Sequence, residues 1–123
     1  MMNMVEYAQK FIGTPYKLGG NVPQDGGMDC SGFVLEVLRA FGKWGLKDDT
    51  AHGIYLFCQR TKQTSTIQKP GMLLFWGTPQ KVTHVSIATG DGYMIEAGGD
   101  DKTGMVRMRP VKWRSDFVAG YIV

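Results

Sequence analysis

The 123-residue chain has only two cysteines and two histidines, and it lacks any long hydrophobic run. Two cysteines and two histidines, widely spaced, are too few for a zinc site, and two cysteines are too few for a disulfide framework. No apolar run approaches the roughly 20 residues that a membrane-spanning helix needs. Lysine and arginine are scattered without a basic run, so the net charge of +3 does not indicate nucleic-acid binding. We therefore expect no metal, no cofactor, no membrane span and no nucleic-acid partner.

A secretory signal is also lacking at the start of the sequence. The first residues, MMNMVEYAQKF, have no basic stretch followed by an apolar stretch. This predicts a protein that is cytoplasmic at synthesis, or that reaches its site of action by another route. Cys30 and Cys58 are then expected to stay reduced, because disulfides are rare in reducing compartments. No role is assigned to Cys58.

Repeats, low-complexity segments and internal linkers are absent as well, so residues 1–123 are predicted to form a single domain. Apolar spacing predicts a helix over 3–12, a second from about Cys30 to Gly42, and a third over 48–60. Helices first and strands later predict an α+β fold, with the helices packed on a mostly antiparallel sheet of about five or six strands. Five short apolar or alternating runs are the predicted strands: 70–76, 84–90, 92–98, 104–110 and 117–123.

Cys30 follows a glycine-rich loop over 13–28 and stands at the first turn of the second predicted helix. Asp29 occupies the N-cap position, where its carboxylate can accept an early backbone N–H. The positive end of a helix stabilises a thiolate over a thiol. Cys30 is therefore either a small core residue, which is the common role of a cysteine, or a nucleophile.

A nucleophilic Cys30 needs a base, and the candidate is His84 at the start of a predicted strand. His52, in the third predicted helix, is expected to be a surface or capping residue. Glu96 stands on the next predicted strand, across the TGDG turn at 89–92. Their even separation places His84 and Glu96 on one face in an ordinary hairpin register. The residues alone also allow a surface histidine and a glutamate that points to solvent.

Other conspicuous residues have simpler interpretations. Trp44, Trp76 and Trp113 are expected in the core or a groove wall. Trp76, close to the strand of His84, is the candidate for lining a substrate cleft. The stretch GGDDKTG at 98–104 lacks the ligand spacing of a calcium loop and predicts a solvated hairpin turn.

Four segments in order, GTPYKLGG, DCSGFV, PGMLLFW and HVSIATGDGYMIEA, resemble the NlpC-type family of cell-wall cysteine peptidases over nearly the whole chain. The resemblance implies a papain-like α+β fold and hydrolysis of peptidoglycan stem peptides, typically between γ-D-glutamate and a diamino acid. Cys30 matches the family nucleophile and His84 the family base. Glu96 falls at the third polar position, where histidine is more usual. Its carboxylate is expected to accept from the Nδ1–H of His84.

The same resemblance implies further site roles. Tyr16 matches a family tyrosine whose hydroxyl would donate to the oxyanion, beside the backbone N–H of the nucleophile. Asp29 and Ser31 would bind the free amine or the backbone of the stem peptide. Met72 and Ser86 stand where the family more often has aspartate and glycine, and these departures bear on local geometry rather than on the chemistry.

The sequence thus predicts a peptidoglycan endopeptidase in which Cys30 attacks the γ-D-glutamyl carbonyl and His84 protonates the leaving amine. Delivery in a phage tail, as a phage endolysin or by a secretion machine is expected, with a phage or secretion protein as partner. A cytoplasmic enzyme acting on free muropeptides also fits. Two alternatives stay open: a catalytically silent wall-binding or assembly module, and an amidase or acyltransferase that uses the same thiol.

Overall fold

The computed structural model describes residues 2–20, 26–99 and 103–123, so residues 100–102 of the predicted turn lie outside the described residues. In the described parts, no helix is both long and apolar enough to span a bilayer. The α+β prediction is confirmed. The elements are α1 (Met4–Gln9), α2 (Cys30–Ala40), α3 (Ala51–Thr61), β1 (Gln63–Thr64), β2 (Leu73–Thr78), β3 (Lys81–Ala88), β4 (Tyr93–Gly98), β5 (Met105–Pro110), the 3₁₀-helix η2 (Val111–Trp113) and β6 (Phe117–Ile122).

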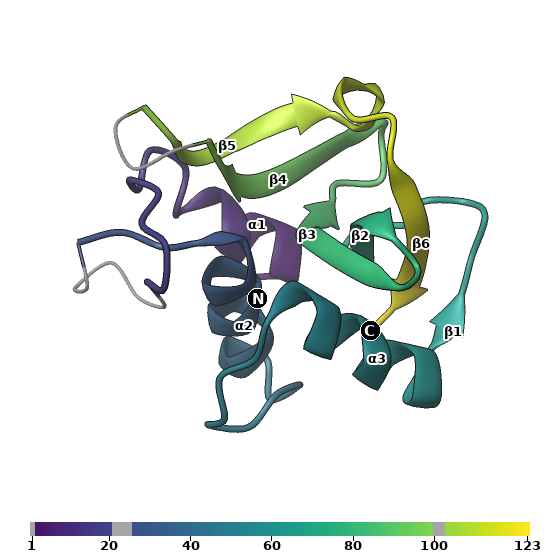
Figure 1. Ribbon diagram of the computed structural model, residues 1–123. Helices are drawn as coiled ribbons and strands as arrows, with labels where there is room; N and C mark the ends of the chain where they lie inside the picture. The colour runs from purple at the N-terminus through teal and green to yellow at the C-terminus, as the bar shows by residue number, and fades with distance from the viewer. Residues whose placement is uncertain (1, 21–25, 100–102) are drawn as a thin grey trace.

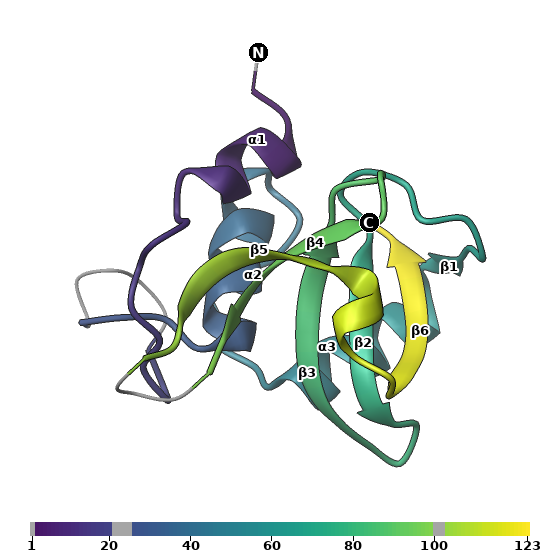
Figure 2. The ribbon, with the colours of Figure 1, turned by 90° about the horizontal axis from the view of Figure 1, so that it is seen from above.

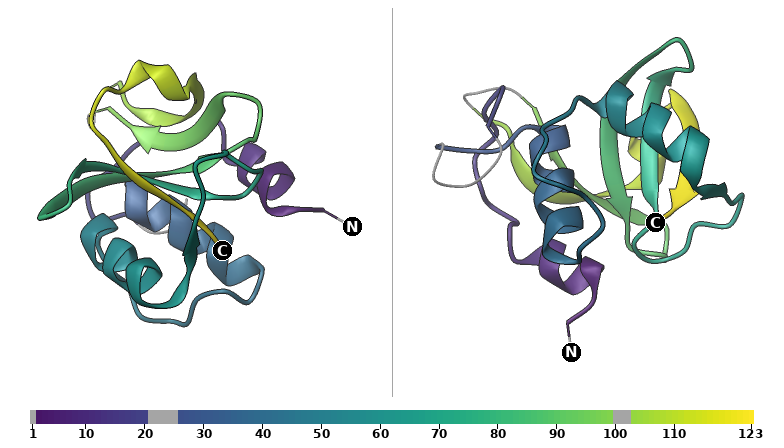
Figure 3. Two further views of the ribbon diagram at one scale, coloured as in Figure 1. Left: turned by 90° about the vertical axis from the view of Figure 1, so that its right-hand side faces the viewer. Right: turned by 90° about the horizontal axis from the view of Figure 1, so that it is seen from below.

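The strands form one six-stranded sheet in the order β1-β6-β2-β3-β4-β5, and every neighbouring pair is antiparallel. The C-terminal strand β6 is therefore inserted between β1 and β2, beside the strand that opens the main part of the sheet. Helices α2 and α3 cover one face of the sheet, as Figure 1 shows. The other face is covered by β5 and η2, which curl over it (Figure 3).

This arrangement gives the protein two hydrophobic cores, one on each face of the sheet. Strand residues alternate between the two faces, so neighbours such as Leu73 and Leu74 belong to different cores. The larger core joins the helices to the sheet, and the smaller lies under β5 and η2. The larger includes Phe33, Val37, Ile54, Phe75 and Ile87, and the smaller consists of Met72, Leu74, Trp76, Ala88 and Met94.

Helix α1 is shorter than the predicted helix over 3–12. Asn3 caps it through a reciprocal capping box with Glu6, in which Oδ1 of Asn3 accepts the Glu6 N–H at 2.8 Å. After Gln9 the chain continues in tight turns, in which each N–H donates to the carbonyl three residues back, at 3.1–3.2 Å. Gly13, with φ of +95°, then turns the chain away.

Helix α3 buries Ala51, Ile54, Tyr55 and Cys58, and Leu56 is exposed. Tyr55 packs edge to face on Phe75, with ring centroids 5.5 Å apart. Aromatic pairs of this geometry add to the stability that burial alone gives. The helix is therefore seated on the same face of the sheet as α2.

Strands β3 and β4 separate soon after the turn that joins them. They pair only at Ile87–Ile95 and Ala88–Met94, whereas β4 stays paired with β5 along its length. Figure 2 shows β4 running diagonally away from β3. His84 and Glu96 lie beyond the last paired residues, on the two strands that diverge.

Candidate active site

Cys30 is the first residue of α2, and Asp29 is the N-cap of that helix. Asp29 Oδ1 accepts the Gly32 N–H at 2.7 Å and the Ser31 hydroxyl at 3.2 Å. The second carboxylate oxygen accepts the Gly19 N–H at 2.9 Å, from the glycine-rich loop. One carboxylate therefore fixes both the beginning of the helix and the loop that passes beside the thiol.

Glycine is required where this loop contacts itself. A Cβ at Gly20 would lie 2.1 Å from the carbonyl oxygen of Gly27, so any side chain there would push the two backbones apart. The close approach lets the Asp29 N–H donate to the Gly20 carbonyl at 3.0 Å. Tyr16 is anchored in the same loop, where its N–H donates to the carbonyl of Gly104 at 2.9 Å.

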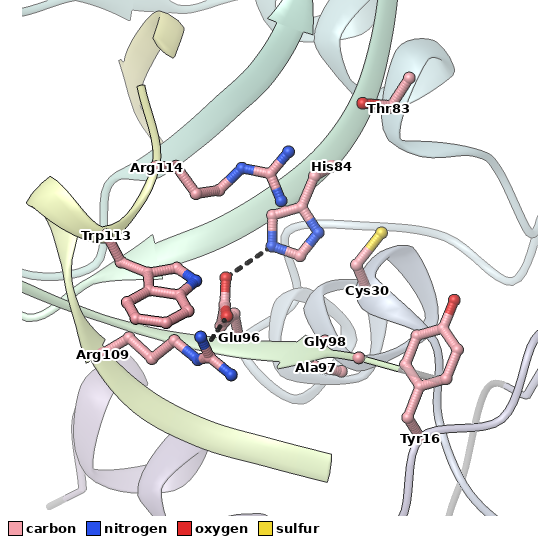
Figure 4. Close-up of a pocket in the computed structure, with 11 residues that line it drawn as sticks. Tyr16, Cys30, Thr83, His84, Glu96, Ala97, Gly98, Arg109, Trp113 and Arg114 are labelled. Atoms are coloured by element: carbon pink, nitrogen blue, oxygen red, sulfur yellow. Dashed lines mark hydrogen bonds and ion pairs between the residues drawn. The ribbon is translucent and has the colours of Figure 1, made fainter. Parts of the chain in front are cut away.

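His84 and Glu96 form a buried pair opposite the thiol. His84 Nε2 lies 2.7 Å from Glu96 Oε1, and the two side chains are 9% and 5% exposed. The prediction that His84 and Glu96 share one face is therefore confirmed. The prediction that the carboxylate contacts Nδ1 is wrong, because it contacts Nε2. Because β3 and β4 diverge, the carboxylate reaches the far nitrogen of the ring. Nδ1, nearer the backbone, is left on the side of Cys30 (Figure 4).

The two partners of His84 decide its charge. Burial by itself lowers the pKa of the imidazole, because it disfavours the cation. Hydrogen bonding and Coulomb attraction to Cys30 and Glu96 outweigh burial and raise the pKa of His84 to about 9. At neutral pH the imidazole of His84 is therefore protonated, with Glu96 on one side and Cys30 on the other.

Two arginines neutralise the other side of Glu96. Arg109 Nε lies 3.3 Å from Glu96 Oε2, and its guanidinium stacks 4.3 Å from the centroid of the Trp113 ring. Arg114 is clamped by Asp116 through two hydrogen bonds of 3.0 and 2.8 Å. Burial would raise the pKa of Glu96, but His84 first, and then Arg109 and Arg114, lower it below its usual range. Glu96 is therefore ionised at neutral pH.

These groups line one cleft of about 370 Å³. The cleft brings together four residues that the sequence singled out, Tyr16, Cys30, His84 and Glu96 (Figure 4). A nucleophile, a base, a carboxylate that orients the base and a hydroxyl donor in one hollow are the parts of a thiol hydrolase. The other lining residues are Thr83, Ala97, Gly98, Gly99, Arg109, Trp113 and Arg114.

Residues 13–121 match the NlpC/P60 family. The chain belongs to the NlpC/P60 family. Its structure is similar to that of the NlpC/p60 domain of the peptidoglycan hydrolase SagA, with a TM-score of 0.76 and 33% identity over 98% of this chain and 96% of that one. Both the predicted family and the papain-like α+β fold are confirmed.

NlpC/P60 relatives in sequence include Protein P54 of Enterococcus faecium, 38% identical over 112 residues, and a gamma-DL-glutamyl hydrolase of Bacillus subtilis, 30% identical over 121 residues. The matches cover 85% and 91% of this chain. They cover only 20% and 27% of the two relatives, so the chain spans about a quarter of their length or less. A probable endopeptidase p60 of Listeria innocua is 35% identical over 94 residues, which are 76% of this chain and 19% of that protein.

Asp29 and Ser31 do not line the NlpC/P60 cleft, although they flank the nucleophile in sequence. They line an adjacent hollow of about 390 Å³. Its walls include two further carboxylates, one of which, Asp48, is ion-paired with Arg39 at 3.0 Å. The other residues of this hollow are Gly19, Asp48, Asp49 and Thr50.

Trp76 is not a cleft residue, which corrects the prediction. It is 1% exposed, and its indole N–H donates to the Ser86 hydroxyl at 3.1 Å inside the smaller core. Trp76 is the register partner of His84 and shares its face of the sheet. Its ring, however, is covered by Arg114 of the chain between β5 and β6 and by Phe117 at the start of β6. Trp113, from that covering segment, lines the cleft and is 66% exposed. Ser86 thus has a structural role where the family more often has glycine.

Sequence reasoning missed Arg109, Arg114 and Gly98. A Cβ at Gly98 would lie 3.1 Å from Glu96 Oε2, so this glycine makes room for the carboxylate. The available signal was the pair of arginines around Trp113, within the stretch RPVKWRSD. Its proximity to Glu96 depends on β5 pairing with β4, which is a long-range contact that local sequence does not show.

The remaining residues that the sequence singled out have structural roles. His52 caps a strand, because its Nδ1 accepts a backbone N–H of β3 at 3.0 Å. Cys58 is buried on α3 with a free thiol, and burial, opposed in part by Lys62, raises its pKa to about 11. The Met72 sulfur accepts the Lys69 N–H at 3.0 Å, at the position where the family more often has aspartate.

Proposed function

We propose that this NlpC/P60 domain is a cysteine peptidase that hydrolyses peptidoglycan stem peptides between γ-D-glutamate and a diamino acid. The observation that carries the proposal is the buried His84–Glu96 pair facing a cysteine at a helix N-terminus. The names of its relatives support it, since they include a gamma-DL-glutamyl hydrolase, probable endopeptidases and a peptidoglycan hydrolase.

Acylation begins with the Cys30 thiolate, which attacks the γ-carbonyl carbon of the glutamate. The oxyanion that forms accepts hydrogen bonds from the Tyr16 hydroxyl and from the backbone N–H of Cys30, at the first position of α2. First-turn N–H groups of a helix have no partner within the helix, so this donor faces the reaction without breaking another bond.

Proton transfer then releases the leaving group. The imidazolium of His84 gives its Nδ1 proton to the amine of the diamino acid, and Glu96 holds the ring at Nε2 while this occurs. The neutral imidazole next takes a proton from water, which attacks the thioester and regenerates the thiolate. The acidic hollow beside Asp29 and Ser31 would hold the free amine of a trimmed stem peptide.

The proposal is tested by digestion of peptidoglycan and defined muropeptides, with products identified by mass spectrometry. We expect a product that ends in γ-D-glutamate, and a loss of at least about 10⁴-fold in rate for Cys30→Ser. Cys58→Ala is the matched control and should keep the activity, because Cys58 lies in the core.

Two other outcomes would contradict the proposal. An intact substrate, with a Cys30 that still reacts with iodoacetamide near neutral pH, would favour an amidase or acyltransferase with another acyl donor. An intact substrate with an unreactive Cys30 would favour a silent wall-binding module. The delivery route by phage or secretion machine stays a prediction from the sequence, which proteomics of purified virions would test.

A further inference from the structure

The proposed chemistry places the reacting bond between Cys30 and the Nδ1 side of His84. The acyl half becomes bonded to Cys30, while the leaving amine must lie against the imidazole that protonates it. Arg109 and Trp113 lie on the far side of His84 and Glu96 from Cys30 (Figure 4). Both residues line the same cleft, so a diamino acid that follows the cleft past the His84 ring, away from Cys30, reaches Arg109 and Trp113.

Arg109 is oriented by its neighbours, but they leave most of its donors unused. Its guanidinium is stacked 4.3 Å from the Trp113 ring centroid, and its Nε lies 3.3 Å from Glu96 Oε2. That Nε is buried, and its geometry toward Glu96 is not that of a hydrogen bond. Among residues 2–20, 26–99 and 103–123, no group accepts a hydrogen bond from Nη1 or Nη2 of Arg109. The side chain is 19% exposed, in the wall of the cleft.

Arg114 provides the internal comparison. It also lies near Glu96 and contributes to the low pKa of that carboxyl. Its planar fork, however, is occupied by Asp116 through two hydrogen bonds of 3.0 and 2.8 Å. Within the described part of the chain, the cleft therefore has one arginine whose Nε and Nη2 are held by a carboxylate and one whose Nη1 and Nη2 have no acceptor.

A stacked guanidinium with open donors matches a carboxylate. The fork of arginine binds both carboxylate oxygens in one plane, and such charge-assisted bonds are about twice as strong as neutral ones. Stacking on Trp113 holds the plane in place before the ligand arrives, so little side-chain freedom remains to be lost on binding. A leaving group that ends in an ammonium would instead meet a like charge.

We propose that Arg109 and Trp113 form a carboxylate-binding subsite for the leaving diamino acid. The subsite favours a diamino acid with a free second carboxylate, such as meso-diaminopimelate, over lysine, which has none. This inference rests on the proposed function for the direction of the substrate in the cleft, and it adds a residue that sets specificity within that reaction.

The test measures binding and turnover separately on three γ-D-glutamyl peptides. Their diamino acids are meso-diaminopimelate, the same residue with its second carboxylate amidated, and L-lysine. Calorimetric titration of Cys30→Ala, which cannot turn over, should show about tenfold tighter binding of the free carboxylate than of either other peptide. Wild-type kcat/KM should follow the same order. The amidated peptide removes the charge without altering the protein, so this comparison does not depend on the folding of a variant.

Variants then assign the preference to a residue. Arg109→Gln should abolish the preference, and Arg109→Lys should keep only part of it, since it retains charge without the fork. Arg114→Gln is the matched control and should keep the preference even if the overall rate falls. A loss of kcat in Arg109→Gln that is equal for all three peptides, with the preference retained, would overturn the subsite and leave Arg109 as a support for Glu96.

Failure of this inference differs from failure of the proposed function. Equal affinity of Cys30→Ala for the three peptides overturns the subsite, whether or not the wild-type protein cleaves them. Absence of cleavage by the wild type, with the tenfold difference in affinity intact, overturns the peptidase proposal and supports the subsite.

Discussion

The thiol and the imidazole of the cleft are held by different kinds of structure. Cys30 is positioned by local structure. It depends on the start of helix α2, on the Asp29 cap and on the close contact of Gly20 with Gly27, all within residues 13–32. His84 is positioned by charge, from Glu96, Arg109 and Arg114 on segments that meet only in the folded sheet. We call the segments that hold Cys30 the first wall of the cleft and those that hold His84 the second wall. Changes in the first wall should therefore alter the stability of helix α2 and its loop, and changes in the second should alter the protonation of His84.

Glu96→Gln should give the largest effect, because it removes the charge that holds the imidazolium. We expect kcat to fall by about 10²–10⁴-fold, as the ring loses its orientation and its stabilising anion. The alkaline limb of the pH–rate profile, set by a His84 pKa of about 9, should move to lower pH. The measurement is kcat and kcat/KM against pH on a defined muropeptide. Glu36→Gln removes a carboxylate of helix α2 that does not line the cleft, so it is the control and should leave the pH profile unchanged. An unchanged alkaline limb in Glu96→Gln would show that Glu96 does not set the protonation of His84.

The pH dependence of stability should report the same pair. A pKa raised from 6.5 to about 9 in the folded state stabilises the protein fully below pH 6.5, and the contribution is lost as the pH rises through 9. The lowered pKa of Glu96 acts in the acidic range, because the stability that it contributes is lost as the pH falls through the pKa of the folded state. We expect the free energy of unfolding to decrease between pH 6.5 and about 9.5 by up to about 3 kcal/mol. Urea denaturation of wild type and His84→Gln measures the difference, and parallel curves for the two proteins would contradict the expectation.

Gly98→Ala should separate geometry from charge in the second wall. The added Cβ would lie 3.1 Å from Glu96 Oε2 and 4.0 Å from His84 Cε1, so the carboxylate must shift. Displacements of a few tenths of an ångström in a catalytic group lower rates, and we expect kcat to fall about tenfold while stability changes by less than about 1 kcal/mol. Gly45→Ala has no atom within 4 Å of the added carbon and should change neither quantity. Wild-type activity in Gly98→Ala would show that the pair tolerates this displacement.

The contrast between the walls also explains what could be predicted from the sequence. The nucleophile, its cap and the glycine loop are encoded within one short stretch, so DCSG and the glycines around it predicted Cys30 and Asp29 at the helix start. The hairpin at TGDG is equally local, and the even spacing of His84 and Glu96 predicted their common face. The helices and the five longer strands followed from the change in apolar period.

The rest depends on contacts that the sequence does not show locally. Which nitrogen of His84 meets Glu96 is decided by the divergence of β3 and β4. Trp113 takes the place predicted for Trp76 because the chain after β5 curls over the sheet and buries the latter. Arg109 enters the site for the same reason. Charges gathered from separate strands are visible only once the strand order is known.

Asp29→Ala should give the smallest change, and it tests whether backbone alone holds the thiol. Loss of an N-cap costs about 1 kcal/mol of stability, and the bond to Gly19 is lost with it. Asn3→Ala removes the cap of α1 and should cost a similar amount without affecting activity, so it controls for stability. Both are compared by thermal unfolding and by steady-state kinetics.

The kinetics of Asp29→Ala distinguish the two roles of this carboxylate. A fall of about fivefold in kcat, at unchanged KM, would show that the cap aligns Cys30 for attack, since only the chemical step is affected. A rise in KM alone would assign Asp29 to substrate binding in the acidic hollow that it lines. If neither constant changes while stability falls as in Asn3→Ala, helix α2 positions the thiol without its cap. The first wall would then depend on glycine contacts rather than on this carboxylate.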